Sequence, residues 1–347
     1  MRILVTGNLG YIGPVLGKSL KNYFNDCYLI GLDTGLFLPC FSSYERTGDT
    51  FYDKQIFKDV RDITISDLKN VDVIVNLAAV SNDPIGKDFE SATEDINFKA
   101  TINLAKLASQ SSVSKFIFAS SCSVYGKAGD KPKTESDLKD PLTAYAKSKI
   151  GVEEFFKENK IDNLNIVCLR FPTACGISDR LRLDLVLNDF VTSAFHYKKI
   201  SILSNGSPWR PLIDVKDMSK AVIWAIKYKT NQTKSPLSIN VGANEWNYQV
   251  KDIATKVKKI LPDTVIEINK NAAQDLRSYR VDFTLYKELA KEFYPTNKIE
   301  NTIEELIRHV KDINVPDNGF RGTHYIRLNH VKNLVSKGLI NKNLRWI

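Results

Sequence analysis

The sequence predicts an α/β fold with a doubly wound parallel sheet, because short apolar runs alternate with helical patterns throughout its first half. The apolar runs are nearly continuous, as expected for strands that are covered by helices on both faces. The amphipathic spacing between them indicates helices that connect consecutive strands. The expected strands are 2–5, 28–32, 71–77, 115–119 and 165–169, and the expected helices are one ending near Tyr23, one at about 93–109 and one at 145–159.

The second half of the chain is less regular and predicts a smaller cap domain beside the sheet. A chain of 347 residues is long for one compact core. A strand at 237–241 is expected to rejoin the sheet, helices are expected at 218–228 and 250–260, and a loop at 204–211. We expect a main domain at 1–175, rejoined by about 211–245, and a cap domain at 176–210 and 246–347 that includes a C-terminal extension.

Composition excludes several classes of protein. Hydrophobic residues make up 43% and charged residues 26%, and no run approaches the ~20 apolar residues of a membrane span. The start MRILVTG lacks the longer apolar core of a signal peptide. The five cysteines are scattered without metal-ligand spacing, so we expect reduced thiols, no metal and a cytoplasmic location. The net charge of +9 is spread along the chain, which favours a Lys-rich surface, or a phosphate-bearing substrate, over a nucleic-acid partner.

A glycine-rich turn links the first expected strand to the first helix. The segment TGNLGYIG contains Gly7, Gly10 and Gly13, with Tyr11 and Ile12 between the last two. Gly7 permits a tight turn, Gly10 lets the backbone approach a pyrophosphate, and Gly13 lets the helix pack closely on the sheet. The helix N-terminus adds unpaired N–H groups and a positive dipole end for phosphates. Such turns also occur without a ligand, so a second signal is needed.

Asp33 supplies this signal at the end of the next strand, about twenty residues further on. A carboxylate there accepts hydrogen bonds from a ribose diol and repels a 2′-phosphate, so the combination predicts NAD rather than NADP. An aspartate that only forms a turn is less consistent with the glycines before it. The main domain is therefore expected to be a Rossmann-like NAD-binding domain.

Tyr145 and Lys149 lie four positions apart on an expected helix and share one face. An unperturbed tyrosine, with a pKa near ~10, is a poor base at neutral pH. An adjacent lysine charge and a positive nicotinamide ring would both lower the pKa of Tyr145. The same spacing occurs by chance in many helices, so the pair needs a companion. The segment SSCSVYG supplies one, because Ser121 and Ser123 follow a parallel strand on one side and face the crevice where ligands bind, although serines also simply end strands.

Together, TGNLGYIG, Asp33, NLAA at 76–79, SSCSVYG and YAKSK resemble the extended short-chain dehydrogenase/reductase family. Within this family they are most similar to the nucleotide-sugar epimerase/dehydratase group, and the resemblance covers roughly 1–312. The ordered set of motifs is far more specific than any one of them. The resemblance implies a Rossmann-like sheet with a smaller mixed α/β substrate-binding cap domain, NAD, a nucleotide-sugar substrate and a homodimer.

The resemblance also assigns roles to individual residues. It implies that Tyr145 is the base, that Lys149 supports it, and that Ser121 is the catalytic hydroxyl, with Asn97 as a structural member of the catalytic set. The expected cofactor-binding residues are Gly7, Gly10, Tyr11, Ile12, Gly13, Asp33, Asp59 and Val60 at the adenine, Leu77, Ala78 and Ala79 under the adenosine, Ser120, Tyr145 and Lys149. The expected substrate-binding residues are Ser81, Ser121, Ser123, Thr173, Asn188, Arg210, Asp275 and Arg277. A plain loop at Ser81 and a helix-start role for Asn188 remain equal alternatives.

Departures from the family pattern fall on the substrate side. Dehydratases and decarboxylases of the family carry an acid after the catalytic hydroxyl, where this chain has Cys122 and Ser123. This exchange argues against dehydration, although an acid from another loop could substitute. Thr173 replaces an asparagine that contacts the substrate. The arginine that precedes the first cap-domain acid is missing, so Arg277 or Arg280 would take over its phosphate contact.

The sequence therefore predicts an NAD-dependent nucleotide-sugar epimerase that oxidises a sugar hydroxyl, at C4, and reduces it again on the other face. The alternative is a one-way 4-dehydrogenase or ketoreductase on the same substrate class. A 4,6-dehydratase and a catalytically silent NAD-binding protein are less favoured alternatives. The set of Tyr145, Lys149 and Ser121 weighs against the silent protein, because binding requires no base. The tail at 316–347 has no assigned role, and the motifs select neither the sugar nor the nucleotide base.

Overall fold

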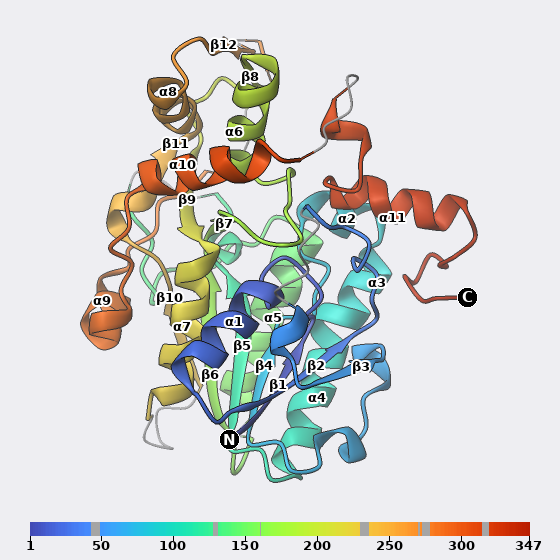
Figure 1. Cartoon of the computed structure of the whole chain (residues 1–347). Helices are drawn as coiled ribbons and strands as arrows, with labels where there is room; N and C mark the ends of the chain where they lie inside the picture. The colour runs from blue at the N-terminus through green and yellow to red at the C-terminus, as the bar shows by residue number, and fades with distance from the viewer. Residues whose placement is uncertain are drawn as a thin grey trace.

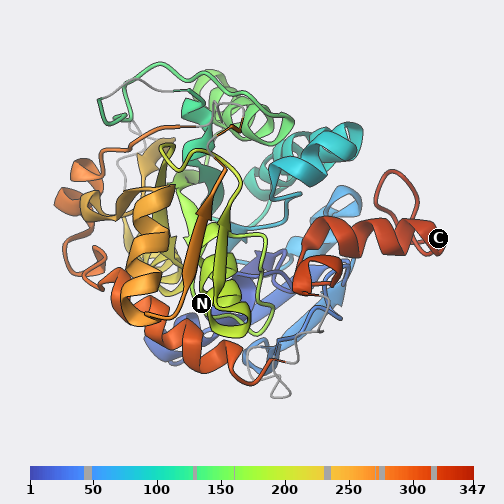
Figure 2. The same ribbon diagram turned by 90° about the horizontal axis from the view of Figure 1, so that it is seen from above.

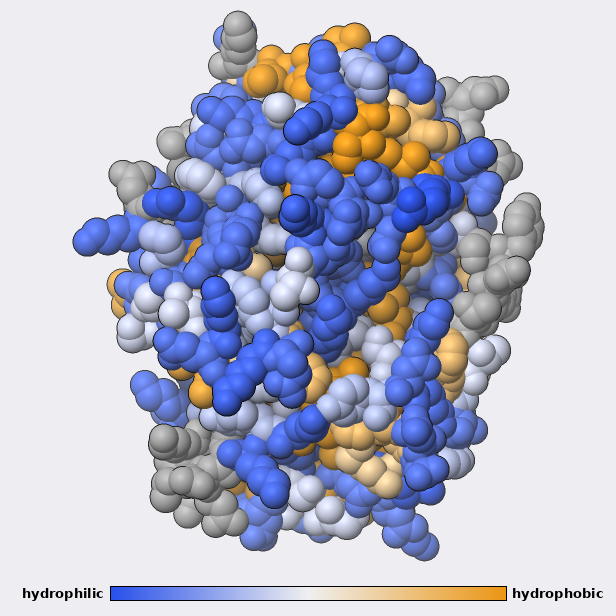
Figure 3. Space-filling model, turned by 60° about the vertical axis from the view of Figure 1, so that its left-hand side comes forward, coloured by the Kyte–Doolittle hydropathy of each residue, from blue (hydrophilic) through white to orange (hydrophobic). Residues whose placement is uncertain are grey.

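The structure is a computed structural model that describes most of the chain. The described residues are 1–42, 49–127, 131–159, 161–229, 236–269, 271–272, 278–313 and 319–347. Within them no helix is long and apolar enough to cross a membrane. The surface in Figure 3 is mainly hydrophilic, and its larger apolar areas lie towards the end of the molecule that carries β8 and β12 in Figure 1.

A seven-stranded parallel sheet forms the centre of the molecule, with the strand order β10-β6-β5-β4-β1-β2-β3 (Figure 1). The predicted doubly wound sheet is therefore confirmed. The order reverses between β1 and β4, and such a switch point is where open α/β sheets bind ligands. The strands are β1 (Arg2–Thr6), β2 (Tyr28–Asp33), β3 (Lys54–Phe57), β4 (Val73–Asn76), β5 (Lys115–Ser121), β6 (Asn165–Phe171) and β10 (Leu237–Asn240).

Both faces of the sheet are buried, which explains the nearly continuous apolar runs. Successive residues of a strand point to opposite faces, so Ile3 and Val5 join one core while Leu4 joins the other. All three are fully buried. Helices α1 (Gly13–Tyr23) and α7 (Val215–Lys227) cover the first face, and α4 (Ala100–Ser109) and α5 (Ala144–Glu158) cover the second (Figure 1).

The predicted helix at 93–109 is present but not continuous. It consists of α3 (Glu90–Glu94), a π-helical turn (Asp95–Lys99) and α4. The turn contains Asn97, whose amide is hydrogen-bonded to the backbone of Val80 rather than exposed to solvent. A side chain that must reach across to a neighbouring loop accounts for the local widening of the helix.

Several elements lack a clear sequence signal and were not predicted. The expected loop at 204–211 is wrong at its end, because a strand begins at Trp209. Helices predicted at 218–228 and 250–260 and the strand that rejoins the sheet are confirmed. The additional elements are α2 (Asp83–Asp88), β7 (Thr173–Cys175), α6 (Val186–Tyr197), β8 (Lys199–Ile202), β9 (Trp209–Asp214), β11 (Asn247–Gln249), β12 (Val265–Ile268), α9 (Thr284–Ala290) and α10 (Ile299–Val310), with α8 (Val250–Ile260) as expected.

A second core lies above the carboxyl ends of the strands. It contains the apolar faces of α6, α8 and α10 with residues of β8 and β9. A three-stranded sheet, β11-β9-β7, and a two-stranded sheet, β12-β8, belong to this part of the molecule (Figure 1). We propose that these elements form the substrate-binding cap domain.

The C-terminal extension continues into α11 (Arg327–Ser336) and an irregular end. Figures 1 and 2 show α11 on the side of α2 and α3, whereas α8 and α9 lie on the opposite side of the molecule. This segment is expected from the sequence to belong to the cap domain. From Leu328 onwards, however, its apolar residues pack in a cluster with Val80 and Ile85, which follow β4 of the main sheet.

Candidate active site

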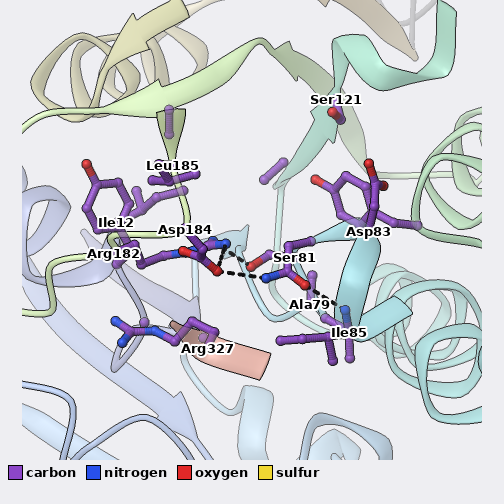
Figure 4. A pocket seen from close by; sticks show the side chains of 18 of the residues that line it. Ile12, Ala79, Ser81, Asp83, Ile85, Ser121, Arg182, Asp184, Leu185 and Arg327 are labelled. Carbon is purple, nitrogen blue, oxygen red and sulfur yellow. Dashed lines mark hydrogen bonds and ion pairs between the residues drawn. The ribbon is translucent and has the colours of Figure 1, made fainter. Parts of the chain in front are cut away.

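A cavity of about 750 Å³ lies at the carboxyl ends of the strands (Figure 4). Its volume is within the ~300–1,000 Å³ that is usual for small-molecule sites. Segments that follow β1, β2, β3, β4, β5 and β6 line it, together with residues of the second core and of the C-terminal extension. The cavity is therefore placed where the sheet topology predicts a ligand.

The glycine turn after β1 forms one end of this cavity. Gly7 has a φ of +73°, and a Cβ atom there would lie 2.6 Å from the backbone nitrogen of Ala78, so only glycine fits. A Cβ on Gly13 would lie 1.8 Å from the carbonyl oxygen of Asn8. Gly13 thus lets the start of α1 lie directly against the turn, while the rest of α1 packs on the sheet. The nearest atom to a Cβ on Gly10, the Gly7 carbonyl oxygen, is 3.2 Å away, and Gly10 lines the cavity.

Asp33 ends β2 beside this turn. Its carboxylate accepts hydrogen bonds from the backbone N–H groups of Leu9, at 3.1 Å, and Gly35, at 2.8 Å. Burial raises the pKa of Asp33, and these two donors counteract part of that effect. Each carboxylate oxygen accepts one of these bonds, which leaves acceptor capacity for a diol in the cavity.

Tyr145 and Ser121 meet at the other end of the cavity. Tyr145 lies in the first turn of α5, which begins after Thr143 caps it by accepting a hydrogen bond from Ala146 N–H. Ser121 is the last residue of β5, and its hydroxyl lowers the pKa of the Tyr145 phenol. The ammonium of Lys149 donates to the carbonyl oxygen of Ala119 at 2.7 Å and lies 5.6 Å from the centre of the Tyr145 ring. The predicted catalytic hydroxyls and the lysine are therefore brought together.

The pKa of Tyr145 differs from the expectation. Burial raises it to about 12, and the Ser121 hydroxyl and the charge of Arg182 lower it only in part. Burial also lowers the pKa of Lys149 to about 7, so this group is only partly protonated at neutral pH. The expectation that Lys149 lowers the pKa of Tyr145 is wrong for the protein without a cofactor. Lys149 is desolvated, and its ammonium points at a carbonyl group. A positive charge bound in the cavity, such as the nicotinamide ring expected from the sequence, would lower the pKa of Tyr145.

Asn97 is fully buried and does not line the cavity. Its amide accepts from Val80 N–H at 2.8 Å and donates to Val80 C=O at 3.0 Å and to the Ser148 hydroxyl at 3.2 Å. These bonds tie the loop after β4 to α5, the helix that carries Tyr145. The structure thus gives Asn97 a positioning geometry.

Sequence reasoning missed a polar network in the middle of the cavity (Figure 4). The guanidinium of Arg182 forms a bidentate ion pair with Asp184, at 2.9 and 3.1 Å. Arg182 also donates to the Ser81 hydroxyl at 3.0 Å, and Asn82 donates to Asp184 at 2.8 Å. The alternation of charged and apolar residues in RLRLD is typical of a strand, but the segment is irregular, so its pattern did not place Arg182 and Asp184 in the cavity.

The remaining predicted residues divide into three groups. The cavity-lining group comprises Tyr11, Ile12, Asp59, Val60, Leu77, Ala78, Ala79, Ser81, Ser120, Ser123, Thr173 and Arg210. Ser123 has a buried hydroxyl without a hydrogen-bond partner in the described part of the chain, which makes it available to a ligand. Asn188 is buried away from the cavity, where it binds Gly176 N–H, the Tyr11 hydroxyl and the Arg182 carbonyl. Asp275 and Arg277 lie outside the described residues.

The fold and this site define a class: a Rossmann-like sheet with a glycine turn, an acid at the end of β2, and a Tyr–Lys–Ser set in one cavity. A model of the NAD dependent epimerase/dehydratase family matches residues 3–242, and the chain belongs to this family. The resemblance to extended short-chain dehydrogenases/reductases is confirmed, and NAD is the cofactor of the family.

The relatives include both epimerases and dehydratases. A putative UDP-glucose 4-epimerase from Methanocaldococcus jannaschii is 27% identical over 231 residues, which is 65% of this chain and 74% of the relative. A human dTDP-D-glucose 4,6-dehydratase is 25% identical over 273 residues, 76% of this chain and 75% of the relative. The structure of a UDP-glucuronic acid 4-epimerase from Bacillus cereus, in complex with UDP-4-deoxy-4-fluoro-glucuronic acid and NAD, has a TM-score of 0.77 and 24% identity, and the match covers 90% of this chain and 99% of that one.

The residues at the glycine turn fit NAD. Gly10 leaves space at the cavity wall, α1 starts at Gly13 and directs its N-terminus to the turn, and Asp33 has free acceptor capacity. A side chain at Gly7 or Gly13 would displace the backbone of the turn. When bound, NAD supplies the hydride acceptor of the reaction.

Replacing Asp33 by asparagine is expected to weaken NAD binding and to reduce the preference for NAD over NADP. The change removes a charged acceptor for the ribose and the repulsion of a 2′-phosphate, a loss of about 10- to 100-fold in NAD affinity. Calorimetric titration of both dinucleotides into both proteins measures it. Equal affinity of the unaltered protein for NAD and NADP would show that Asp33 does not select the cofactor.

Proposed function

We propose that this enzyme is a nucleotide-sugar 4-epimerase. The observation that carries this proposal is the arrangement at the end of β5, where the Tyr145–Ser121 pair faces the cavity and the next positions are Cys122 and Ser123. Cys122 is fully buried, and burial raises its pKa. Neither residue is an acid that can move a second proton, as elimination of water requires.

The proposed reaction uses one base and one hydrogen-bond donor. Ser121 hydrogen-bonds the sugar hydroxyl and holds it against Tyr145. Tyr145 removes the hydroxyl proton as hydride leaves the carbon that bears this hydroxyl. The resulting ketone has lost one proton and one hydride. Presenting its other face reverses both transfers, since Tyr145 returns the proton to the same oxygen. Asn97 and Thr143 fix α5, so that the phenol stays at the strand end.

The proposed position of the substrate follows from charge. The diphosphate of a nucleotide sugar requires cations, and Arg210 lines the cavity on the side of the second core. The sugar would lie between Tyr145 and the Arg182–Asp184 pair, within reach of the Ser123 hydroxyl and Thr173. Arg182 is already neutralised by Asp184, which favours its role in shaping the pocket over diphosphate binding.

Incubation of the purified enzyme with a panel of UDP- and dTDP-sugars tests this proposal. Mass spectrometry and proton NMR of the products are followed together with absorbance of reduced nicotinamide. We expect a product of unchanged mass and inverted configuration at C4, without accumulation of reduced cofactor. A product lighter by two hydrogens, with reduced cofactor formed in step, would instead identify a 4-dehydrogenase.

A 4,6-dehydratase is a second candidate because of Asp83. This residue begins α2, lines the cavity and accepts a hydrogen bond from the Thr143 hydroxyl at 2.8 Å. Its charge raises the pKa of Tyr145, so the two groups interact. Asp83 could therefore supply the carboxyl group that the segment after Ser121 lacks.

Replacing Asp83 by asparagine distinguishes the two candidates. For an epimerase, loss of the negative charge lowers the pKa of Tyr145, so the rising limb of the pH–rate profile should move to lower pH while C4 inversion persists. The measurement is the rate of C4 inversion between roughly pH 5 and pH 10, a range wide enough to show the titration of the essential base. A substrate that loses water with the unaltered enzyme but not with the variant would identify a dehydratase.

We also propose a cytoplasmic location and a homodimer. All five cysteines are buried free thiols, which agrees with a reducing compartment. The homodimer is expected from the family resemblance, and sedimentation analysis of the purified protein measures it.

A further inference from the structure

The C-terminal extension lies against the main sheet domain at the end of the cavity that contains Asp33. Its apolar residues form a cluster with Leu36, Phe37, Val80 and Ile85, and the members from the extension are Leu328, Val331, Leu334, Val335, Ile340 and Leu344. Figures 1 and 2 show this segment beside α2 and α3. The extension is thus packed on the segments that follow β2 and β4.

Polar contacts fix the end of the extension at three further points. The Trp346 indole N–H donates to the Thr34 carbonyl at 2.8 Å, next to Asp33. Arg345 forms a bidentate ion pair with Asp62, at 2.6 and 3.0 Å. In addition, Arg61 donates to the carbonyl of residue 343 at 2.8 Å while its guanidinium pairs with Asp59.

These contact points surround the expected adenosine site. Asp33 is expected at the ribose, Asp59 and Val60 at the adenine, and Ala78 and Ala79 under the adenosine. The extension contacts the residues directly after each of these three segments.

Leu344 brings an apolar side chain from the extension into the cavity wall. It lines the cavity and is 5% exposed. Its φ of +56° is unfavourable for leucine, and the conformation is held by the bond of its N–H to the Asn341 carbonyl at 2.9 Å. A strained backbone that directs a leucine into a cavity is typical of a functional position.

Arg327 brings a positive charge into the same wall (Figure 4). It is 3% exposed, and its guanidinium donates to the carbonyl oxygens of His324 and Arg180, at 2.9 and 2.7 Å. Among the described residues it forms no ion pair with a carboxylate within 4.0 Å, whereas Arg182 and Arg180 both do. A buried cation in a cavity wall is stabilised by an anionic ligand such as a pyrophosphate.

We infer that the C-terminal extension, residues 319–347, is a wall of the cofactor site that covers the adenosine half of NAD, with Leu344 as the contacting side chain. This inference rests on the proposed placement of NAD. A covered adenosine lengthens the residence time of the cofactor, because the wall must open before NAD can leave. Retention suits an enzyme that returns the hydride to the same substrate, since the reduced cofactor must stay bound.

Leu344→Asn tests the inference without adding strain, because asparagine tolerates a positive φ better than most residues. We expect the affinities for NAD and for ADP-ribose to fall by the same factor, about tenfold for one lost apolar contact, while the affinity for nicotinamide mononucleotide stays unchanged. The release rate of NAD should rise correspondingly. Lys342→Ala is the matched control, since Lys342 is exposed on the same segment and should change neither quantity.

Thermal unfolding of each variant without ligand tests whether the fold is retained. Arg345→Glu is a second variant, in which the new carboxylate repels Asp62 and loosens the same wall. Unchanged ADP-ribose affinity and NAD release in both variants would overturn the inference. Loss of ADP-ribose binding in Asp33→Asn but not in Leu344→Asn would overturn it while the NAD placement stands. Unchanged binding in all three variants would overturn the placement as well.

Discussion

Replacing Tyr145 by phenylalanine is expected to reduce turnover by about a hundred- to ten-thousand-fold. The variant removes the phenol hydroxyl on which Ser121 acts and leaves the half-buried ring in the cavity wall. NAD affinity should remain within a factor of two to three of the original, because the glycine turn and Asp33 are untouched. Steady-state kinetics and calorimetric titration of NAD measure the two quantities.

Tyr248→Phe is the matched control for this change. Tyr248 lies on β11, outside the residues that line the cavity, and loses the same hydroxyl. Its turnover should equal that of the unaltered enzyme. If Tyr145→Phe retained full turnover, Tyr145 would not be the base and another group in the cavity would have to remove the proton.

Replacing Arg170 by methionine is expected to lower the free energy of unfolding by about 3–5 kcal/mol. Arg170 lies on β6 and pairs with Glu153 of α5 at 2.6 Å, and both side chains are only 4% exposed. The same carboxylate accepts a hydrogen bond from Ser120, and Arg170 also donates to the Tyr125 hydroxyl at 2.9 Å. Removing the cation leaves a buried charge without its partner.

Two comparisons make this second prediction specific. Lys199→Met breaks an ion pair with Glu267 whose side chains are 48% and 57% exposed, so it should cost less than ~1 kcal/mol. The double variant Arg170→Met/Glu153→Met removes both buried charges and should regain much of the stability. Urea unfolding measures all four proteins. A loss for Arg170→Met no larger than for Lys199→Met would contradict the importance of this network.

The parts that could be predicted from the sequence depend on local signals. The parallel strands follow from apolar runs that must be buried on two faces, and the turn at Gly7 needs glycine for reasons of backbone geometry alone. Asp33, Ser121 and Tyr145 were found because strand ends and helix faces determine where these side chains point. Their assembly in one cavity then follows from the strand order.

The parts that could not be predicted depend on contacts between distant segments. The Arg182–Asp184 pair and Ser81 are about a hundred positions apart in the chain, and the pair lies in an irregular segment. Trp346 reaches Thr34 across 312 positions, so no local signal could place the extension. The pKa values of Tyr145 and Lys149 depend on burial, which the spacing of the two residues does not reveal.

The most direct test of the central claim is to follow deuterium from C4 of a labelled nucleotide sugar that the enzyme turns over. If the enzyme oxidises C4 and returns the same hydride to the other face, the inverted product keeps its deuterium at C4 and gains none at C5 or C6 in deuterated water. Proton NMR of the product distinguishes these positions. Transfer of the label to released cofactor, or its transfer to C6 with loss of water and entry of solvent deuterium at C5, would contradict the account of a 4-epimerase.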